Sequence, residues 1–199
     1  MGYSLSWAAV RGSTPEAVRD ALALRATGAR EEFPESEVTG TELPEGWYMI
    51  VSNRDGLRLT SDEVLARLSA TGEVVVCSVE EHVMFSFAAH WRSGRRVWSV
   101  QHDAQRDIEH LEAEGELPPR FIVVRDELRA KQTAAGGRKA SVDHIFDVPV
   151  VLAHELTGYR HDSVIPGKAD DAFEVLAVTS VDKPRKPEGT SLWKRLFGG

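Results

Sequence analysis

The chain has 199 residues, of which 42% are hydrophobic and 28% are charged, and its formal net charge is −7. This length and composition suit one globular domain with a sizeable core and argue against disorder throughout. The charge is uneven, because residues 183–199 hold five Lys or Arg against one Glu, which leaves −11 on residues 1–182. An acidic body without a basic stripe repels phosphate backbones, so the composition argues against nucleic-acid binding.

The cellular location is inferred from targeting patterns and from the number of cysteines. The first residues lack a charged segment followed by a long apolar one, and no window approaches the ~18 apolar residues of a membrane span. The single cysteine, Cys77, lies in the apolar run 74–79 and is expected to be a buried, inert thiol. These patterns predict a cytoplasmic protein.

The first 45 residues predict one strand, one helix and a long loop. Apolar residues alternate from Tyr3 to Ala9, which predicts a half-buried strand ending at Gly12. Ser13 or Thr14 can cap a helix with Pro15 in its first turn, continuing to Gly28. Residues 29–45 are polar and contain two prolines, so they are expected to form a surface loop.

Two strands in the next part are apolar on both faces and are therefore expected in the interior of a sheet. They are residues 46–51 and 73–80. Between them, the run Thr60-Ser61-Asp62-Glu63 forms a capping box that begins a helix ending at Gly72.

Residues 83–103 have the pattern of a β-hairpin and are the clearest local signal in the chain. A two-residue turn at Ser93-Gly94 pairs Arg92 with Arg95. Continued without interruption, this register also pairs His90 with Val97, Ala89 with Trp98 and Phe85 with His102. One face of the hairpin then carries the large apolar side chains, namely Val83, Phe85, Phe87, Ala89, Trp91, Trp98 and Val100. The other face is weakly polar and could meet solvent or a loop.

The second half of the domain adds helices and a last strand. The expected elements are a strand at 108–112, a helix from Leu117-Pro118-Pro119 to Gly136-Gly137, a helix capped by Asp147 running to Thr157, and a strand at 173–178. This order predicts an α+β fold: a mostly antiparallel sheet with a central hairpin at about 83–103, packed against helices. We assign 1–180 to one globular domain, 181–190 to a Pro/Lys/Arg-rich linker and 191–199 to an amphipathic tail.

The sequence motifs do not support a metal or a cofactor. The chain has no Gly-rich phosphate loop, no nucleophile elbow and no paired Cys-x-x-Cys. His154-Glu155 begins like a zinc-protease helix, but Gly158 stands where the second histidine is required. In the hairpin register, His82 and His90 point away from His102, which argues against a shared metal. We therefore expect no cofactor and no metal.

One acid/base cluster stands as the enzymatic alternative. Five side chains fall near the open end of the hairpin, where carboxylates and imidazoles could exchange protons: Glu80, Glu81, His82, His102 and Asp103. This alternative is a small hydrolase or transferase with the loop 29–45 as a lid. No placed nucleophile supports it, so these polar strand ends are more simply explained as solvated.

The C-terminal tail is the strongest hint of a partner. Its large apolar residues are four apart, so one helical turn places them on one side beside two cations; the segment is Leu192, Trp193, Lys194, Arg195, Leu196 and Phe197. A helix this short does not persist alone and must dock. We favour a groove on a partner over a groove on its own body, and both over an anionic membrane surface.

These observations lead to a functional hypothesis. We expect a non-catalytic, cytoplasmic protein-binding module of the immunity or adaptor type, whose acidic body is steered toward another, basic protein. The sequence does not identify that protein or define an oligomeric state.

Overall fold

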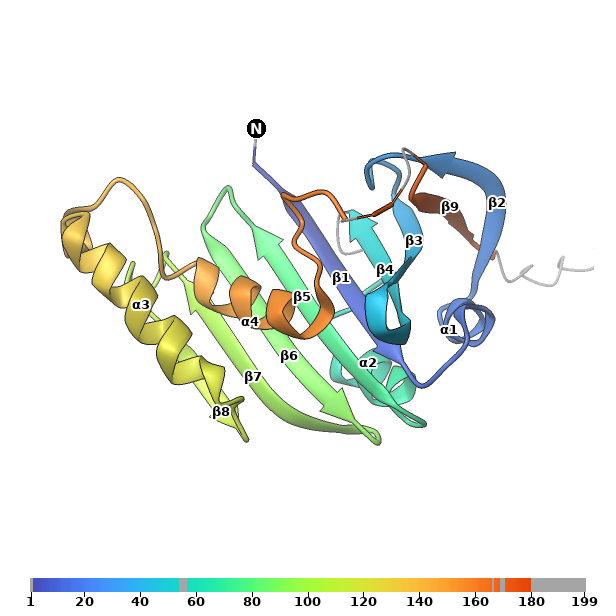
Figure 1. Ribbon diagram of the computed structural model, residues 1–199, viewed down its shortest axis with the longest axis horizontal. Coiled ribbons are helices and arrows are strands. Elements are labelled where there is room, and N and C mark those ends of the chain that lie inside the picture. Colours follow the sequence, from blue (N-terminus) through green and yellow to red (C-terminus); the bar gives the residue numbers. More distant parts are fainter. Residues whose placement is uncertain (1, 54–56, 166, 169–170, 180–199) are drawn as a thin grey trace, which may run out of the picture.

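A computed structural model describes residues 2–53, 57–165, 167–168 and 171–179 (Figure 1). It contains one nine-stranded sheet in the order β2-β9-β3-β4-β1-β5-β6-β7-β8, and every neighbouring pair is antiparallel. The strands are β1 (Ser4–Arg11), β2 (Leu24–Glu31), β3 (Val38–Leu43), β4 (Trp47–Asn53), β5 (Glu73–Glu80), β6 (Phe85–Arg92), β7 (Arg95–Asp103), β8 (Glu112–Gly115) and β9 (Phe173–Val178). The helices are α1 (Pro15–Ala21), α2 (Asp62–Leu68), α3 (Arg120–Ala134) and α4 (Asp147–Thr157). The expected α+β class is confirmed.

Helices cover both faces of the sheet, and each face has its own apolar core. On one face, α4 lies across β5, β6 and β7 with α3 beside it (Figure 1), and Trp7, Val75 and Val100 pack in a core with residues of both helices. On the other face, α1 and α2 contribute Val18 and Leu65 to a second core. Each face of the sheet therefore forms part of a different core.

The central position of the apolar strands is confirmed. β1 lies between β4 and β5, and all three are buried along nearly their whole length. The expectation that β1 is half-buried was wrong, because its small residues, such as Ala8, pack against the α1/α2 side. Cys77 on β5 is fully buried, and burial raises the pKa of its thiol to about 12.

The hairpin turn is confirmed, but the register beyond it was wrong. Ser93 and Gly94 both have positive φ and join the Arg92–Arg95 pair, as a two-residue hairpin turn requires. The pairing shifts between His90 and Trp91, so that His90 pairs with Trp98. This bulge moves β7 by one residue, and a one-residue shift exchanges the faces of every side chain beyond it.

Because of this bulge, two further expectations about the faces of the hairpin were wrong. Trp98 and Val100 lie in the α3/α4 core, whereas Ala89 and Trp91 lie in the α1/α2 core, so these residues do not share one face. Because Ser86 pairs with His102 and strand side chains alternate, His90 and His102 lie on the same face rather than on opposite ones.

Residues 29–45 do not form the expected loop. α1 ends at Ala21, with Ala23 at a φ of 53°, and the chain continues into β2 and β3. β2 is an edge strand with exposed side chains, which explains its polar sequence. β3 is buried but uses Thr and Gly: Gly40 leaves room for the Tyr48 hydroxyl, and the Thr41 hydroxyl donates to the Ala172 carbonyl at 2.8 Å.

The cap of α1 was predicted correctly, but the capping box at 60–63 was wrong, because Ser61 is the cap of α2 and Glu63 is only the second helical residue. The Thr14 hydroxyl accepts from the Ala17 N–H, and the Ser61 hydroxyl accepts from the Val64 N–H. Asp147 is inside α4 rather than its cap; the orphan N–H groups of Ile145 and Phe146 instead donate to Asp143. β8 also begins four residues later than the expected strand at 108–112.

The predicted linker at 181–190 and tail at 191–199 lie outside the described residues. Across the described part of the chain, the longest helix falls short of the length and apolar character that a bilayer crossing demands.

Candidate functional site

The five candidate acid/base residues separate into three groups. Glu80 and His82 pair with each other at the surface, with 2.7 Å between Glu80 Oε1 and His82 Nδ1, and the Ser4 hydroxyl also donates to Glu80. The His82 side chain is 63% exposed. No described carboxylate or imidazole of the other two groups is bonded to this pair.

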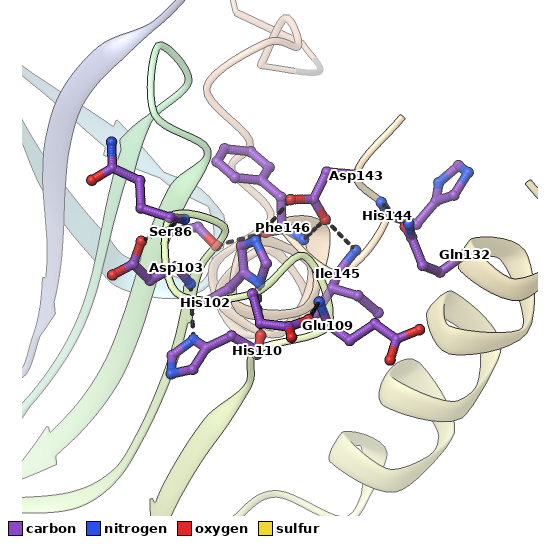
Figure 2. A network of polar contacts seen from close by, with 12 residues as sticks. Ser86, His102, Asp103, Glu109, His110, Gln132, Asp143, His144, Ile145 and Phe146 are labelled. Atoms are coloured by element: carbon purple, nitrogen blue, oxygen red, sulfur yellow. Dashed lines mark hydrogen bonds and ion pairs between the residues drawn. The ribbon is translucent and has the colours of Figure 1, made fainter. Parts of the chain in front are cut away.

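His102 forms the centre of the second group and is fully buried (Figure 2). Its Nδ1 donates to the His110 carbonyl at 2.7 Å, and its Nε2 lies 2.8 Å from Asp143 Oδ2. The other oxygen of Asp143 accepts from the Ile145 and Phe146 N–H groups at 3.0 and 3.1 Å. His102 therefore ties the end of β7 to the start of α4.

This geometry leaves His102 no free nitrogen for a substrate. Both ring nitrogens face oxygen acceptors, so one proton lies between Nε2 and the Asp143 carboxylate in addition to the proton on Nδ1. An acid/base catalyst must reach a reacting group, directly or through one water. The His102–Asp143 pair is instead enclosed and acts as a crosslink.

Asp103 completes the same network through the loop that follows β7 (Figure 2). Its backbone N–H donates to His110 Nδ1 at 3.0 Å, and its carboxylate accepts from the Gln105 N–H at 3.0 Å. Nε2 of His110 lies 3.0 Å from Arg106 Nη1 and 3.2 Å from Glu112 Oε1.

A polar cleft of about 530 Å³ lies beside this network, between the loop and α3. Its charged residues are largely paired with one another, because Arg138 contacts both Asp107 and Glu109. The pairing balances the charge of the lining and leaves the cleft without a dominant sign.

The third group joins Glu81 to a residue far away in sequence. Glu81 Oε1 lies 3.3 Å from His161 Nε2, and its other oxygen accepts from the Tyr3 N–H at 2.9 Å. The His161 side chain is 1% exposed, and the Tyr3 ring packs edge-on against it at 5.0 Å. Nδ1 of His161 is buried and has no hydrogen-bond partner among the described residues.

Two adjoining cavities surround His161, and we call them together the His161 groove. They have volumes of about 320 and 600 Å³ and share three lining residues, Phe33, Pro34 and His161. The walls come from the start of β1, the turn between β2 and β3, and the chain between α4 and β9 (Figure 1).

The surface of the groove is mixed, with large apolar side chains on its rim and polar groups among them. Tyr3, Phe33 and Val164 stand on its rim with 44%, 48% and 72% of their surface exposed. Glu32 and Lys168 line one cavity, and Glu35 lines the other. Such a site, which combines apolar side chains with a few polar groups, is typical of binding pockets.

Two serine hydroxyls line the described part of the groove, and neither is bonded to His161. The Ser4 hydroxyl donates to Glu80, and the Ser163 hydroxyl lies 3.3 Å from Asp162. Nε2 of His161 faces Glu81, and its Nδ1 is enclosed.

Most residues of the groove were not predicted as site residues from the sequence. Glu81 was among the candidates, but His161 comes 80 positions later, after the glycine that ends α4. Phe33 was available as a signal, since it is the one aromatic residue in the polar stretch 29–45.

Several charged residues at and near the hairpin tip form ion pairs, His90 with Glu73 among them. At the tip of the hairpin, Arg92 pairs with Glu73 and Arg96 with Glu114. His154, on the exposed side of α4, is not joined to His161. Among the described residues, no group of three or more His, Cys, Asp or Glu side chains is arranged to hold a metal ion.

Two regions thus compete as the functional site: the enclosed network around His102 and the open His161 groove. The first uses its hydrogen-bonding groups internally, and the second presents apolar surface outward. The chain matches no protein-family model, no curated protein and no solved structure.

Proposed function

We propose that the protein is a non-catalytic, cytoplasmic protein-binding module of the immunity or adaptor type. Its body takes an apolar and basic segment of another protein into the His161 groove. The observation that carries this proposal is the gathering of Tyr3, Phe33 and Val164, three exposed large apolar side chains, around two adjoining cavities. Contiguous apolar surface that stays exposed is a mark of interaction sites.

Charge supports a basic segment as the partner chemistry. Glu32 and Glu35 stand on the groove rim, and residues 1–182 carry a net charge of −11. An acidic body accelerates encounter with a basic partner and disfavours acidic ones. A lone, buried thiol that cannot form an internal disulfide suits a reducing compartment.

The alternative of a small hydrolase or transferase has less support. It requires Glu80, Glu81, His82, His102 and Asp103 to act on one substrate, and these residues bond to separate partners. The proposed lid at 29–45 is replaced by β2 and β3.

Selection from a displayed peptide library tests the proposal directly. We expect the full-length protein to enrich peptides that combine aromatic or leucine residues with Lys or Arg. Val164→Asp adds a charge to the groove rim and should weaken the selected peptides at least about tenfold, which corresponds to about 1.4 kcal/mol.

A matched control separates the groove from general surface effects. Val142 is also an exposed valine, 53% against 72% for Val164, and lies outside the groove. Val142→Asp should leave peptide affinity unchanged. Enrichment no better than for an unrelated protein, or equal loss in both variants, would contradict the proposal.

A further inference from the structure

The occupant that best fits the groove is present in the chain itself. Residues 191–197 place Leu192, Trp193, Leu196 and Phe197 at four-residue spacings around Lys194 and Arg195. A segment this short is unstable as a free helix in water and gains order only by packing against another surface. It therefore needs an apolar acceptor with acidic neighbours.

The His161 groove has both properties. Its two cavities, of about 320 and 600 Å³, each fall in the range of about 300–1,000 Å³ that is common for ligand sites. Aromatic side chains of Tyr3 and Phe33 line the rim, and Glu32 and Glu35 lie close to Phe33. The two aromatic anchors thus meet two cavities, and the two cations meet two carboxylates beside the single cation of Lys168.

The connecting chain is long enough for the tail to reach the groove of its own molecule. Thr179 is tied to Ala23 by a 2.7 Å backbone hydrogen bond at the end of β9, whereas Phe173, at the start of β9, lines the groove. The strand between them rises about 3.3 Å per residue, or roughly 20 Å in total. Residues 180–190 can span up to about 36–40 Å when extended.

We propose that residues 191–197 bind the His161 groove of the same molecule, with Trp193 and Phe197 as the apolar anchors and Lys194 and Arg195 facing Glu32 and Glu35. The tail then occupies the site that a partner segment takes, and a partner binds by displacing it. This proposal rests on the function proposed above, because both use the same groove. It assigns the tail to its own body rather than to a partner or a membrane.

Paramagnetic labelling of the full-length chain tests this docking. Cys77 is fully buried, so a nitroxide reagent reacts selectively with the new thiol of Ser191→Cys. We expect strong broadening of the backbone amide signals of Phe33 and Val164, and none at Ile122, an exposed residue of α3 outside the groove. Broadening spread evenly over the surface, or absent from the groove, would overturn the proposal.

Three controls define the contact: substitutions, a mixture of labelled and enriched protein, and anionic vesicles. The broadening should disappear in a Trp193→Ser/Phe197→Ser double variant and in Val164→Asp, and should persist in Val142→Asp. In a mixture of spin-labelled unenriched protein with unlabelled ¹⁵N-enriched protein it should also vanish. If the mixture shows the full effect, the tail binds a second copy and the intramolecular assignment fails. Anionic phospholipid vesicles should not abolish the broadening when no partner peptide is present. If they do, the tail binds a membrane, and the proposal that a partner protein displaces it is overturned.

Peptide affinity distinguishes failure of this inference from failure of the proposed function. If the tail blocks the groove, the Trp193→Ser/Phe197→Ser variant should bind the selected peptides about tenfold more tightly than the unaltered protein. Equal affinity would reject the tail as occupant and leave the groove a partner site. Groove broadening with no selectable peptide would keep the tail contact and reject the partner function.

Discussion

At the residue scale, Glu73 on β5 is the most strongly stabilised carboxylate in the described chain. It accepts hydrogen bonds from Arg11 Nε at 2.9 Å, His90 Nε2 at 2.8 Å and Arg92 Nη2 at 3.2 Å. Burial raises the pKa of Glu73, but these hydrogen bonds outweigh it and lower the pKa from 4.5 to about 2. Because the folded pKa is depressed, the stabilisation is complete above pH 4.5 and is lost as the pH falls toward 2.

We predict that Glu73→Gln flattens the pH dependence of stability in this window. For a shift of this size, the wild-type free energy of unfolding should fall by roughly 2–4 kcal/mol through this group between pH 4.5 and 2. Urea unfolding at a series of pH values measures it. Glu155→Gln, which alters an exposed pair with Arg120, serves as the control and should keep the wild-type slope. An unchanged slope in Glu73→Gln would show that the carboxylate is not responsible.

Substitution of Asp143 tests the structural role of its hydrogen bond with His102. Asparagine can still accept from the N–H groups at the start of α4, and its amide can donate to His102 Nε2 once the shared proton is gone. Alanine leaves these buried groups unpaired. We predict a loss below about 1 kcal/mol for Asp143→Asn and about 2–4 kcal/mol for Asp143→Ala, measured by urea unfolding. Equal losses would contradict the hydrogen-bond account.

At the element scale, the sequence predicted strands wherever both faces are apolar or a turn is explicit. β5 was predicted with its observed ends, as was β9, and the Ser93-Gly94 turn was located. The register was missed because a bulge at His90/Trp91 leaves no mark in the apolar pattern. β2 and β3 were missed for different reasons: β2 lies at an exposed edge, and β3 buries Thr and Gly in place of large apolar residues.

Two glycines in edge strands provide a matched test of steric constraint. Gly28 on β2 and Gly115 on β8 have φ values of 85° and 84°, so alanine strains both equally. An added Cβ meets nothing within 4 Å at Gly28 but lies 2.1 Å from the Val97 carbonyl oxygen at Gly115.

We predict that Gly28→Ala costs about 1–2 kcal/mol, the cost of the left-handed conformation alone. Gly115→Ala should cost at least about 1–3 kcal/mol more, because β8 must move away from β7 to relieve the overlap. Thermal unfolding of the two variants measures the difference. Similar losses would mean that β8 detaches without cost.

At the scale of the whole molecule, the candidate site depends on contacts between distant segments. The sequence singled out Glu81, but it gave no means of joining this residue to His161, 80 positions later. Only the path of the chain between α4 and β9, which returns beside the start of β1 (Figure 1), brings His161 to Tyr3 and Phe33. A site built from three crossing segments has no local motif.

The same sheet carries both cores, and this arrangement predicts how the molecule unfolds. β1 contributes Trp7 to the α3/α4 core and Ala8 to the α1/α2 core. Neither core can therefore unfold without exposing strands that also form the other core. We therefore expect one cooperative transition. Leu152→Ala on α4 and Leu65→Ala on α2, both fully buried, should each lower stability by about 2–5 kcal/mol.

Urea unfolding followed by far-ultraviolet circular dichroism and by tryptophan fluorescence tests this coupling. The two probes should give the same midpoint in the wild type and in each variant, with an unchanged dependence on urea, because the surface exposed on unfolding stays the same. If instead Leu65→Ala splits the transition, the α1/α2 layer unfolds separately. The shared strands would then couple the two cores only weakly. In that case the groove should unfold together with the α3/α4 core. Tyr159 lines the groove and packs edge-on against Trp7 of this core, with 5.4 Å between the ring centroids.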